Sequence, residues 1–208
     1  MNLPPVRLID NNGYENGMIK RRDLILSGAA FGLLNAGKVV AHTAPHFVMP
    51  EDYNPTIVEM ENLLPAGQIY VFPNIFRLFL TLPDQRAIRY TVGVGRQGLY
   101  HDGSFTIGAK RKWPSWTPTP AMIRRDPETY EGYADGMPGG IDNPLGARAM
   151  YLFDENGRDT YLRIHGTNAP RTIGTAVSNG CARLTNDHAK ILYEQVAIGA
   201  RVELYPQF

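Results

Sequence analysis

Short apolar segments separated by proline-containing turns constrain the fold of this chain more than any other feature. Three of them follow one another at residues 68–72, 76–82 and 87–94. The intervening pairs Pro73-Asn74 and Pro83-Asp84 are typical of turns, so we predict three successive strands of a β-meander. Residues 77–81 are apolar at nearly every position, which indicates a central strand that is covered on both faces.

Further strands and one helix are predicted in the rest of the chain. The strands lie at residues 103–109, 147–153, 160–165 and 201–205. Before the last of them, Thr185 or Asn186 caps a predicted helix that ends near Val196 and has Ala189 and Leu192 on one face. With 21 Gly and 16 Pro in 208 residues, the sequence predicts a mainly β fold, a β-sandwich of mixed sheets with one helix in the C-terminal region.

Composition bounds the function as well as the fold. A hydrophobic content of 43% suffices for one sizeable core, and the length favours a single domain. The formal net charge is +1, so the sequence indicates no basic surface for nucleic acid. Five scattered His and one Cys do not have the spacing of metal ligands, so we expect no metal site.

Residues 113–141 are expected to be irregular. Residues 113–120 contain three prolines, each of which removes a backbone donor, so neither a regular helix nor a regular strand is predicted. Trp113 and Trp116 in this segment either line a cleft or cap a core beneath a loop. Residues 122–141 mix charged residues with four glycines, which is typical of a long loop, and we predict a lid over one face.

The N-terminal segment has the features of an export signal. Residues 1–17 have no pattern and are expected to be disordered or not translated, with Met18 as the start. A basic run at residues 20–22 precedes a diluted apolar stretch at residues 24–37, which is shorter than the roughly 20 residues of a membrane-spanning helix. The adjacent arginines and the weak hydrophobicity resemble a twin-arginine signal. An uncleaved helix is the alternative.

We therefore divide the chain into three parts. Residues 1–44 are the predicted export signal, cleaved after Ala41 or Ala44 and leaving no stable membrane span. Residues 45–67 carry prolines among acidic residues and are predicted to be an extended linker, with a short helix at residues 56–64 as an option. Residues 68–208 form the predicted catalytic domain.

Cys181 is the only cysteine in the chain, so it cannot form an internal disulfide. Gly180 precedes it and Arg183 follows at the second position, where backbone can approach a substrate and a cation favours a thiolate. His165, sixteen residues upstream, ends a predicted strand and can lie beside the thiol as its base. A free cysteine is also often a small buried hydrophobe, but the Gly, Ser, Thr and Asn around this one favour a nucleophile. The pair predicts Cys/His acyl-transfer chemistry.

These residues stand in two runs, Ile164-His165-Gly166-Thr167 and Ser178-Asn179-Gly180-Cys181-Ala182-Arg183. The runs resemble the active-site signature of the L,D-transpeptidases, which are bacterial cell-wall enzymes, and the resemblance extends over about residues 68–205. It includes the segments at residues 90–96, 113–118 and 143–146. Many members have His where this chain has Asn179, and residues 102–105 replace a turn that is usual in the family.

The resemblance implies an enzyme of the periplasm of a Gram-negative bacterium that needs no cofactor. Cys181 would attack the L-to-D bond of a peptidoglycan tetrapeptide stem and release D-alanine. His165 would be its base, in a thiolate and imidazolium pair, with its ring oriented by the carbonyl of Gly166. The amides of Asn179, Gly180 and Cys181 would bind the oxyanion. The expected substrate contacts are Arg183, Ser178, Thr167 and Trp116.

Two features of the predicted site are open. Arg183 either binds a substrate carboxylate or pairs internally. The acyl group passes to water or to an amine, either of a second stem or of a protein such as an outer-membrane protein. We predict transpeptidation because residues 122–141 are long enough for a lid that excludes water. Four acidic side chains of this segment would suit a cationic amine: Asp126, Glu128, Glu131 and Asp135.

Three other functions compete with transpeptidation. The first is an L,D-carboxypeptidase or endopeptidase that trims stems. The second is a non-catalytic wall-binding module, which would not need both Cys181 and His165. The third is a thiol redox protein, which would need a resolving cysteine that the sequence lacks.

Overall fold

The computed structural model describes residues 6–7 and 48–208, so the predicted export signal at residues 1–44 lies outside the described residues except for residues 6–7. The strands are β1 (Val6–Arg7), β2 (Thr56–Met60), β3 (Ile69–Phe72), β4 (Arg77–Leu82), β5 (Arg86–Thr91), β6 (Val94–Gly95), β7 (Gly103–Lys112), β8 (Arg148–Phe153), β9 (Asp159–His165), β10 (Ala176–Ser178), β11 (Ala182–Arg183) and β12 (Arg201–Leu204). The helices are α1 (Pro120–Arg125), α2 (Pro127–Tyr130) and α3 (Asn186–Gln195), with short 3-10 turns at Glu51–Tyr53, Pro73–Ile75, Glu131–Tyr133 and Pro170–Thr172.

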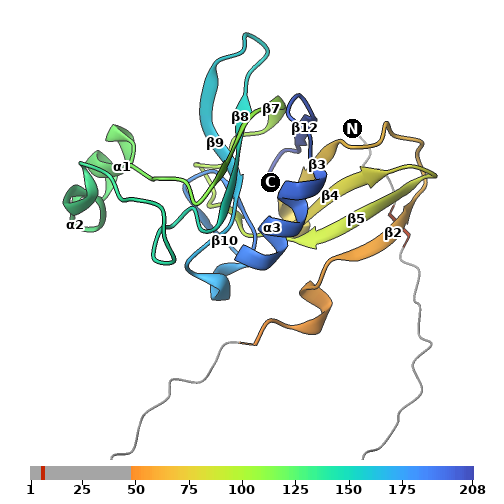
Figure 1. The fold of residues 1–208 in the computed structure, drawn as a ribbon, viewed down its shortest axis with the longest axis horizontal. Coiled ribbons are helices and arrows are strands. Elements are labelled where there is room, and N and C mark those ends of the chain that lie inside the picture. Colours follow the sequence, from red (N-terminus) through yellow and green to blue (C-terminus); the bar gives the residue numbers. More distant parts are fainter. Residues whose placement is uncertain (1–5, 8–47) are drawn as a thin grey trace, which may run out of the picture. The chain divides into compact units, whose positions relative to one another are not determined.

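One ten-stranded sheet contains most of the strands, in the order β1-β2-β5-β4-β3-β12-β7-β8-β9-β11. The sheet is mixed, because β12 is parallel to β3 and β11 is parallel to β9 while the other neighbours are antiparallel. β6 and β10 form a separate parallel pair. Figure 1 shows β2 to β5 on one side and β7 to β9 on the other, with α3 beside them.

The main hydrophobic core lies between these two groups of strands and α3. Its fully buried members include Leu78 and Tyr90 from β4 and β5, Ile107 and Met150 from β7 and β8, Ile164 from β9, and Leu192 from α3. Burial of each large apolar side chain stabilises the fold by about 1.5–3 kcal/mol. Both groups of strands therefore share one core, which confirms the expected mainly β sandwich.

β4 is the central strand that its apolar sequence predicts. Leu78 and Leu80 belong to the main core, whereas Phe79 between them belongs to a second buried cluster with Phe72 and Val58. Successive side chains of a strand point to opposite faces, so both faces of β4 are covered. The predicted meander of β3, β4 and β5 is confirmed by their antiparallel pairing.

The predicted short helix at residues 56–64 is wrong, because residues 56–60 form β2. Val58 and Met60 are buried, whereas Glu59 between them is exposed and Ile57 before them is 51% exposed, which is the period of two of a half-buried strand. β2 pairs antiparallel with β5, so part of the expected linker belongs to the sheet. At residues 6–7, where we expected no element, β1 pairs with β2.

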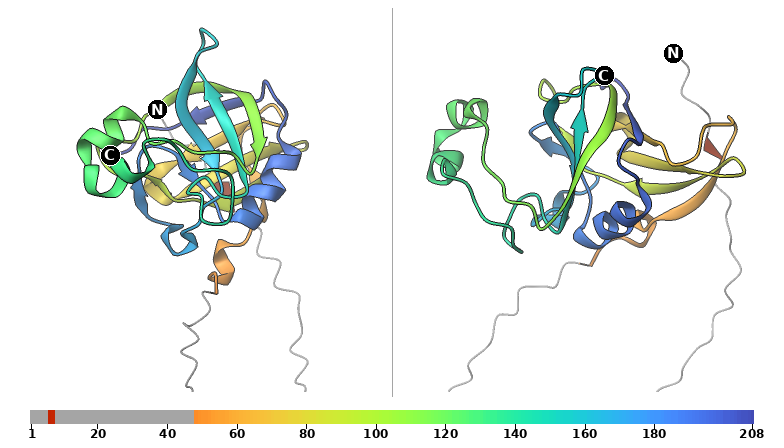
Figure 2. Two further views of the ribbon diagram at one scale, coloured as in Figure 1. Left: turned by 60° about the vertical axis from the view of Figure 1, so that its left-hand side comes forward. Right: turned by 45° about the horizontal axis from the view of Figure 1, so that its top comes forward.

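The predicted lid is more regular than we expected. α1 and α2 each begin at a proline, and the preceding Thr119 and Asp126 accept hydrogen bonds from the backbone amides of Met122 and Thr129. A capping side chain followed by proline is a helix-start signal that the sequence contains. Figure 1 and the right-hand view of Figure 2 both show these green helices standing apart from the sheet, joined to it by extended stretches.

Candidate active site

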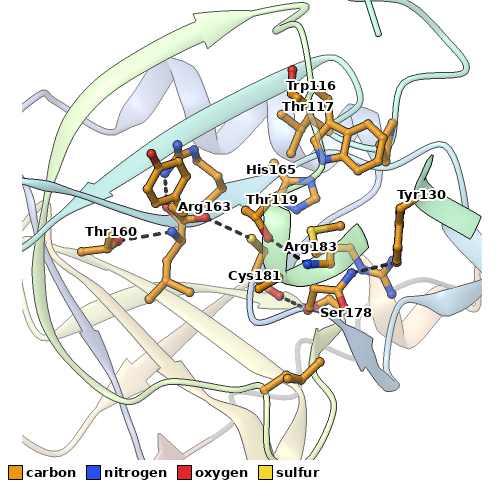
Figure 3. A pocket seen from close by; sticks show the side chains of 18 of the residues that line it. Trp116, Thr117, Thr119, Tyr130, Thr160, Arg163, His165, Ser178, Cys181 and Arg183 are labelled. Atoms are coloured by element: carbon orange, nitrogen blue, oxygen red, sulfur yellow. Dashed lines mark hydrogen bonds between the residues drawn. The ribbon is translucent and has the colours of Figure 1, made fainter. Parts of the chain in front are cut away.

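The sheet brings Cys181 and His165 to the same cleft. His165 is the last residue of β9, and Cys181 immediately precedes β11. β11 runs parallel to β9, with Ala182 beside Ile164 and Arg183 beside His165. Both side chains line a cleft of about 530 Å³, and Figure 3 shows them facing it together with Arg183.

The loop before Cys181 is held by Ser178 and made possible by Gly180. The Ser178 hydroxyl donates to the carbonyl of Cys181 at 2.6 Å and accepts from the amide of Gly180 at 3.2 Å. Gly180 has a φ of +121°, and a Cβ there would lie 2.8 Å from the carbonyl oxygen of Leu99. Only glycine allows this turn, which presents the thiol to the cleft.

His165 is held in one tautomer by the next residue. Its Nδ1 lies 2.5 Å from the carbonyl oxygen of Gly166, and a carbonyl can only accept, so Nδ1 carries the proton. In this tautomer Nε2 carries the lone pair that can accept a proton. Gly166 packs against the side-chain oxygen of Asn186, which accepts from the amide of Ala147, and a Cβ on Gly166 would clash with it.

Burial disfavours the charged form of both members of the pair. Burial lowers the pKa of His165 to about 3, and Arg183 and Arg163 add to this effect. Burial also raises the pKa of the Cys181 thiol, although both arginines act in the opposite direction. Desolvation therefore opposes the thiolate and imidazolium pair that we expected, because it disfavours both charges.

A strained residue in β9 directs its carbonyl at the thiol. Tyr161 has a φ of +63°, which is unfavourable for a bulky residue, and its carbonyl oxygen lies 4.0 Å from Cys181 Sγ. The side chains of Asp159 and Thr160 fix this conformation by accepting from the amides of Tyr161 and Leu162 at 2.9 and 3.2 Å. Strain of this kind is often found at functional sites.

Two of the arginines that line the cleft, Arg163 and Arg183, differ in their partners. Arg163 forms a bidentate ion pair with Asp159 at 2.6 and 2.8 Å. Arg183 has no ion pair with any described residue, and its Nε and Nη2 are buried without a hydrogen-bond partner. Its backbone, in contrast, exchanges two hydrogen bonds with Gly93. The structure therefore gives no support to internal pairing of the Arg183 side chain.

The three amides predicted to bind an oxyanion are not equivalent. The amide of Gly180 already donates to Ser178. The amides of Asn179 and Cys181 donate to no residue in the part of the chain that the structure describes. The latter two remain candidates for an oxyanion.

Some of the other predicted substrate contacts line the cleft and one does not. Ser178 and Trp116 line the cleft. Thr167 does not line it: the residue is buried, and its hydroxyl accepts from the amide of Ala169 at 3.0 Å, so we leave it out of the proposed substrate contacts. Trp116 both lines the cleft and packs against Tyr130 and Tyr133 of the lid.

Sequence reasoning missed several cleft residues. They are His101, Arg125, Tyr130, Tyr161 and Arg163. Tyr161 and Arg163 lie four and two residues before His165 on the same strand, so the period of two could have placed them on one face. Arg125 and Tyr130 come from the lid segment, in which only acidic side chains were predicted to contact the acceptor.

Two other findings concern metal sites and membrane helices. Within residues 6–7 and 48–208, no three His, Cys, Asp or Glu side chains lie close enough together to hold a metal ion. In the same ranges, no helix combines the length and the apolar character that crossing a membrane requires.

Residues 67–204 match the L,D-transpeptidase catalytic domain family (YkuD), and the chain therefore belongs to this family. Among curated relatives, the probable L,D-transpeptidase ErfK/SrfK of Escherichia coli is 37% identical over 134 residues. The match spans 63% of this chain but only 41% of that relative's length.

Solved structures resemble the chain as well. A Brucella melitensis protein described as a probable carnitine operon oxidoreductase caia is 45% identical, with a TM-score of 0.52, over 74% of this chain and 93% of that chain. An L,D-transpeptidase of Enterococcus faecium is 15% identical, with a TM-score of 0.50, over 68% of this chain and 50% of that chain. The second likeness concerns the fold alone.

Proposed function

We propose that this protein is a peptidoglycan L,D-transpeptidase with Cys181 as the nucleophile and His165 as the general base. The observation that supports it best is the parallel pairing of β9 and β11, which brings the thiol and an imidazole with a free Nε2 to one cleft. Family membership over residues 67–204 supports the reaction class.

In the acylation half, Nε2 of His165 takes the thiol proton as Cys181 Sγ attacks the carbonyl of the L-to-D bond. The oxyanion accepts hydrogen bonds from the amides of Asn179 and Cys181. Nε2 then gives the proton to the leaving nitrogen of D-alanine, the C–N bond breaks, and a thioester remains. Hydrogen bonding of Nδ1–H to Gly166 stabilises the imidazolium that forms transiently.

In the second half, an amine attacks the thioester carbonyl and Nε2 takes its proton. Collapse of the tetrahedral intermediate breaks the C–S bond, and the thiol recovers its proton from Nε2. Arg183 binds a carboxylate of the donor stem, because its Nε and Nη2 are buried beside the cleft without partners.

The acceptor is an amine rather than water. Met122, Arg125 and Tyr130 of the lid segment line the cleft, which supports exclusion of water from the thioester. The acidic residues of the lid do not line the cleft, and Asp126 caps α2, so they do not support a site for a cationic amine. The acceptor is a second stem, with an outer-membrane protein as the other candidate.

Mass spectrometry of purified tetrapeptide muropeptides tests this function. Wild-type protein is expected to release D-alanine and form cross-linked dimers, and Cys181→Ala to abolish both. His165→Gln should lower kcat at least about a hundredfold. His188→Gln is the matched control, because His188 is also buried but does not line the cleft. Tripeptide monomers alone would favour trimming, and no product would favour a wall-binding module.

A thiol redox function has less support. The Brucella relative is described as an oxidoreductase. Thiol–disulfide exchange within one chain needs a resolving cysteine, and Cys181 is the only cysteine of 208 residues. Cys181-dependent transpeptidation in the assay above would decide between the two.

The domain organisation is part of the proposal. Residues 1–44 form a twin-arginine export signal, residues 45–67 lead to the catalytic domain, and residues 68–208 form that domain in the periplasm. Arg21 and Arg22 before the diluted apolar stretch support the signal. β2 lies within the segment 45–67, so this segment also contributes a strand to the sheet.

A further inference from the structure

Two arginines converge on Asn179, which lines the cleft; Arg125 lines it as well, whereas Arg96 lies beside it. Nη2 of Arg125 donates to Asn179 Oδ1 at 2.6 Å, and Nη2 of Arg96 donates to the same oxygen at 3.1 Å. The side-chain nitrogen Nδ2 of Asn179 donates to the hydroxyl of Tyr130 at 2.9 Å. The neutral side chain of Asn179 therefore contacts two positively charged guanidinium groups.

The fold fixes this arrangement. β6 and β10 are parallel, and Arg96 and Asn179 are the residues that follow their ends, so the pairing sets them side by side. Arg125 is the last residue of α1 in the lid, and it lines the cleft together with Asn179 and Cys181. Three separate segments therefore meet at Asn179, which is two positions before Cys181 in the sequence.

The charge at this point is not neutralised by the protein. Neither Arg96 nor Arg125 has an ion pair with any residue that the structure describes. The side chains that line the cleft include no Asp or Glu. Each guanidinium has five N–H donors, and both arginines are exposed, so donors remain for a ligand.

We propose that Arg96 and Arg125 form, around Asn179, a carboxylate-binding subsite at the cleft. The subsite selects stem peptides with a free carboxylate over peptides in which that carboxylate is a carboxamide. An amide has no charge to pair with the two guanidinium groups and cannot accept a bidentate bond on two oxygens. The proposal rests on the proposed function for the identity of the ligand as a stem peptide.

Isothermal titration of peptides into full-length Cys181→Ala protein tests the subsite without turnover. Three tetrapeptides are compared: one with all carboxylates free, one with internal carboxylates converted to carboxamides, and one with a C-terminal carboxamide. Amidation of the recognised carboxylate should raise Kd about five- to tenfold. The peptide that loses affinity shows whether the subsite binds the terminal or an internal carboxylate.

The variants Arg96→Gln and Arg125→Gln, singly and together, complete the test. In the double variant the free acid should bind as weakly as the peptide that is amidated at the carboxylate recognised by Arg96 and Arg125, and amidation of that carboxylate should have no further effect. Any effect of amidation at the carboxylate bound by Arg183 should remain. Arg124→Gln is the matched control, because it removes the same charge from the same helix at a residue that does not line the cleft. Tyr130→Phe removes a lid contact without changing charge and should leave the amidation ratio unchanged.

Several outcomes would overturn the subsite. They are equal affinities for the three peptides, absence of binding, or an amidation ratio that is unchanged in the double variant. Turnover of the tetrapeptide by wild-type protein is measured separately. Selective binding without turnover would support the subsite and refute the transpeptidase, and turnover without selectivity would do the reverse.

Discussion

At the scale of single residues, burial decides the charge of the proposed catalytic pair. Arg163 and Arg183 lower the pKa of Cys181, but desolvation raises it by more. For His165, desolvation and the same two cations act in one direction and lower the pKa. A nearby cation therefore does not by itself predict a thiolate, and in the proposed mechanism the proton moves from sulfur to Nε2 during the attack.

This charge state predicts the pH profile of alkylation. Cys181 is the only thiol, so iodoacetamide reports it alone. The rate should rise about tenfold per pH unit between pH 7 and pH 8.5, because only the thiolate reacts and its pKa is raised. The urea-unfolded protein, with a thiol pKa of about 8.5, is the reference and should react faster at pH 7. A plateau reached below pH 7 would contradict the raised pKa of Cys181.

The pKa of His165 also predicts a pH dependence of stability. The pKa of His165 is about 3 in the folded state and about 6.5 in the unfolded state. Between pH 6.5 and pH 3 the unfolded state therefore binds a proton at His165 that the folded state does not bind. The free energy of unfolding should therefore fall as pH falls. From pH 7 to pH 5, urea unfolding should show wild-type protein losing up to about 2 kcal/mol more than His165→Gln. Parallel losses would refute the depressed pKa, since His188 is present in both proteins.

At the scale of elements, the period of the apolar residues was sufficient to predict a strand or helix wherever the segment is regular. The strands β3, β4, β5, β8 and β9 follow from apolar patterns and turns, and Thr185 caps α3 as one of the two predicted residues. β2 was missed because its alternation of buried and exposed residues is short and is surrounded by prolines and acidic residues. The bulge in β9 could not be predicted, because hydrogen bonds from Asp159 and Thr160 stabilise it in three dimensions.

The positive φ of Tyr161 in this bulge predicts that glycine is more stable than alanine at this position, which is the reverse of the usual order in a strand. In a regular strand Gly is less stable than Ala by about 0.5–1 kcal/mol, but at a positive φ a side chain costs about 1–2 kcal/mol. Tyr161 is 71% exposed with a φ of +63°, so Tyr161→Gly should unfold at higher urea concentration than Tyr161→Ala. Thr106, an exposed residue of β7 without positive φ, is the control, and there Ala should be the more stable. The same order at both positions would refute the strain.

At the scale of the whole molecule, the candidate site depends on contacts between distant segments. The sequence signature identified the thiol, the imidazole and the glycines, because their chemistry is visible in the residue types. Asn179 contacts Arg96 and Arg125, which lie 83 and 54 residues away, and these contacts depend on the β6–β10 pairing and on the fold of the lid. No local pattern contains that information, which is why the sequence predicted the reaction class but not the two arginines beside Asn179.

The proposed location of the molecule rests on Arg21 and Arg22, and it predicts a specific route of export. A reporter fused after residue 48 should be exported by the pathway for folded proteins, because the apolar stretch that follows the arginines is diluted by Gly, Ser, Ala and Asn. Changing both arginines to lysine keeps the charge and should abolish export. The control changes Lys20 to arginine, which leaves the pair intact and should have no effect. Export that survives the double change would refute the twin-arginine signal while leaving the catalytic proposal untouched, because the two rest on different residues.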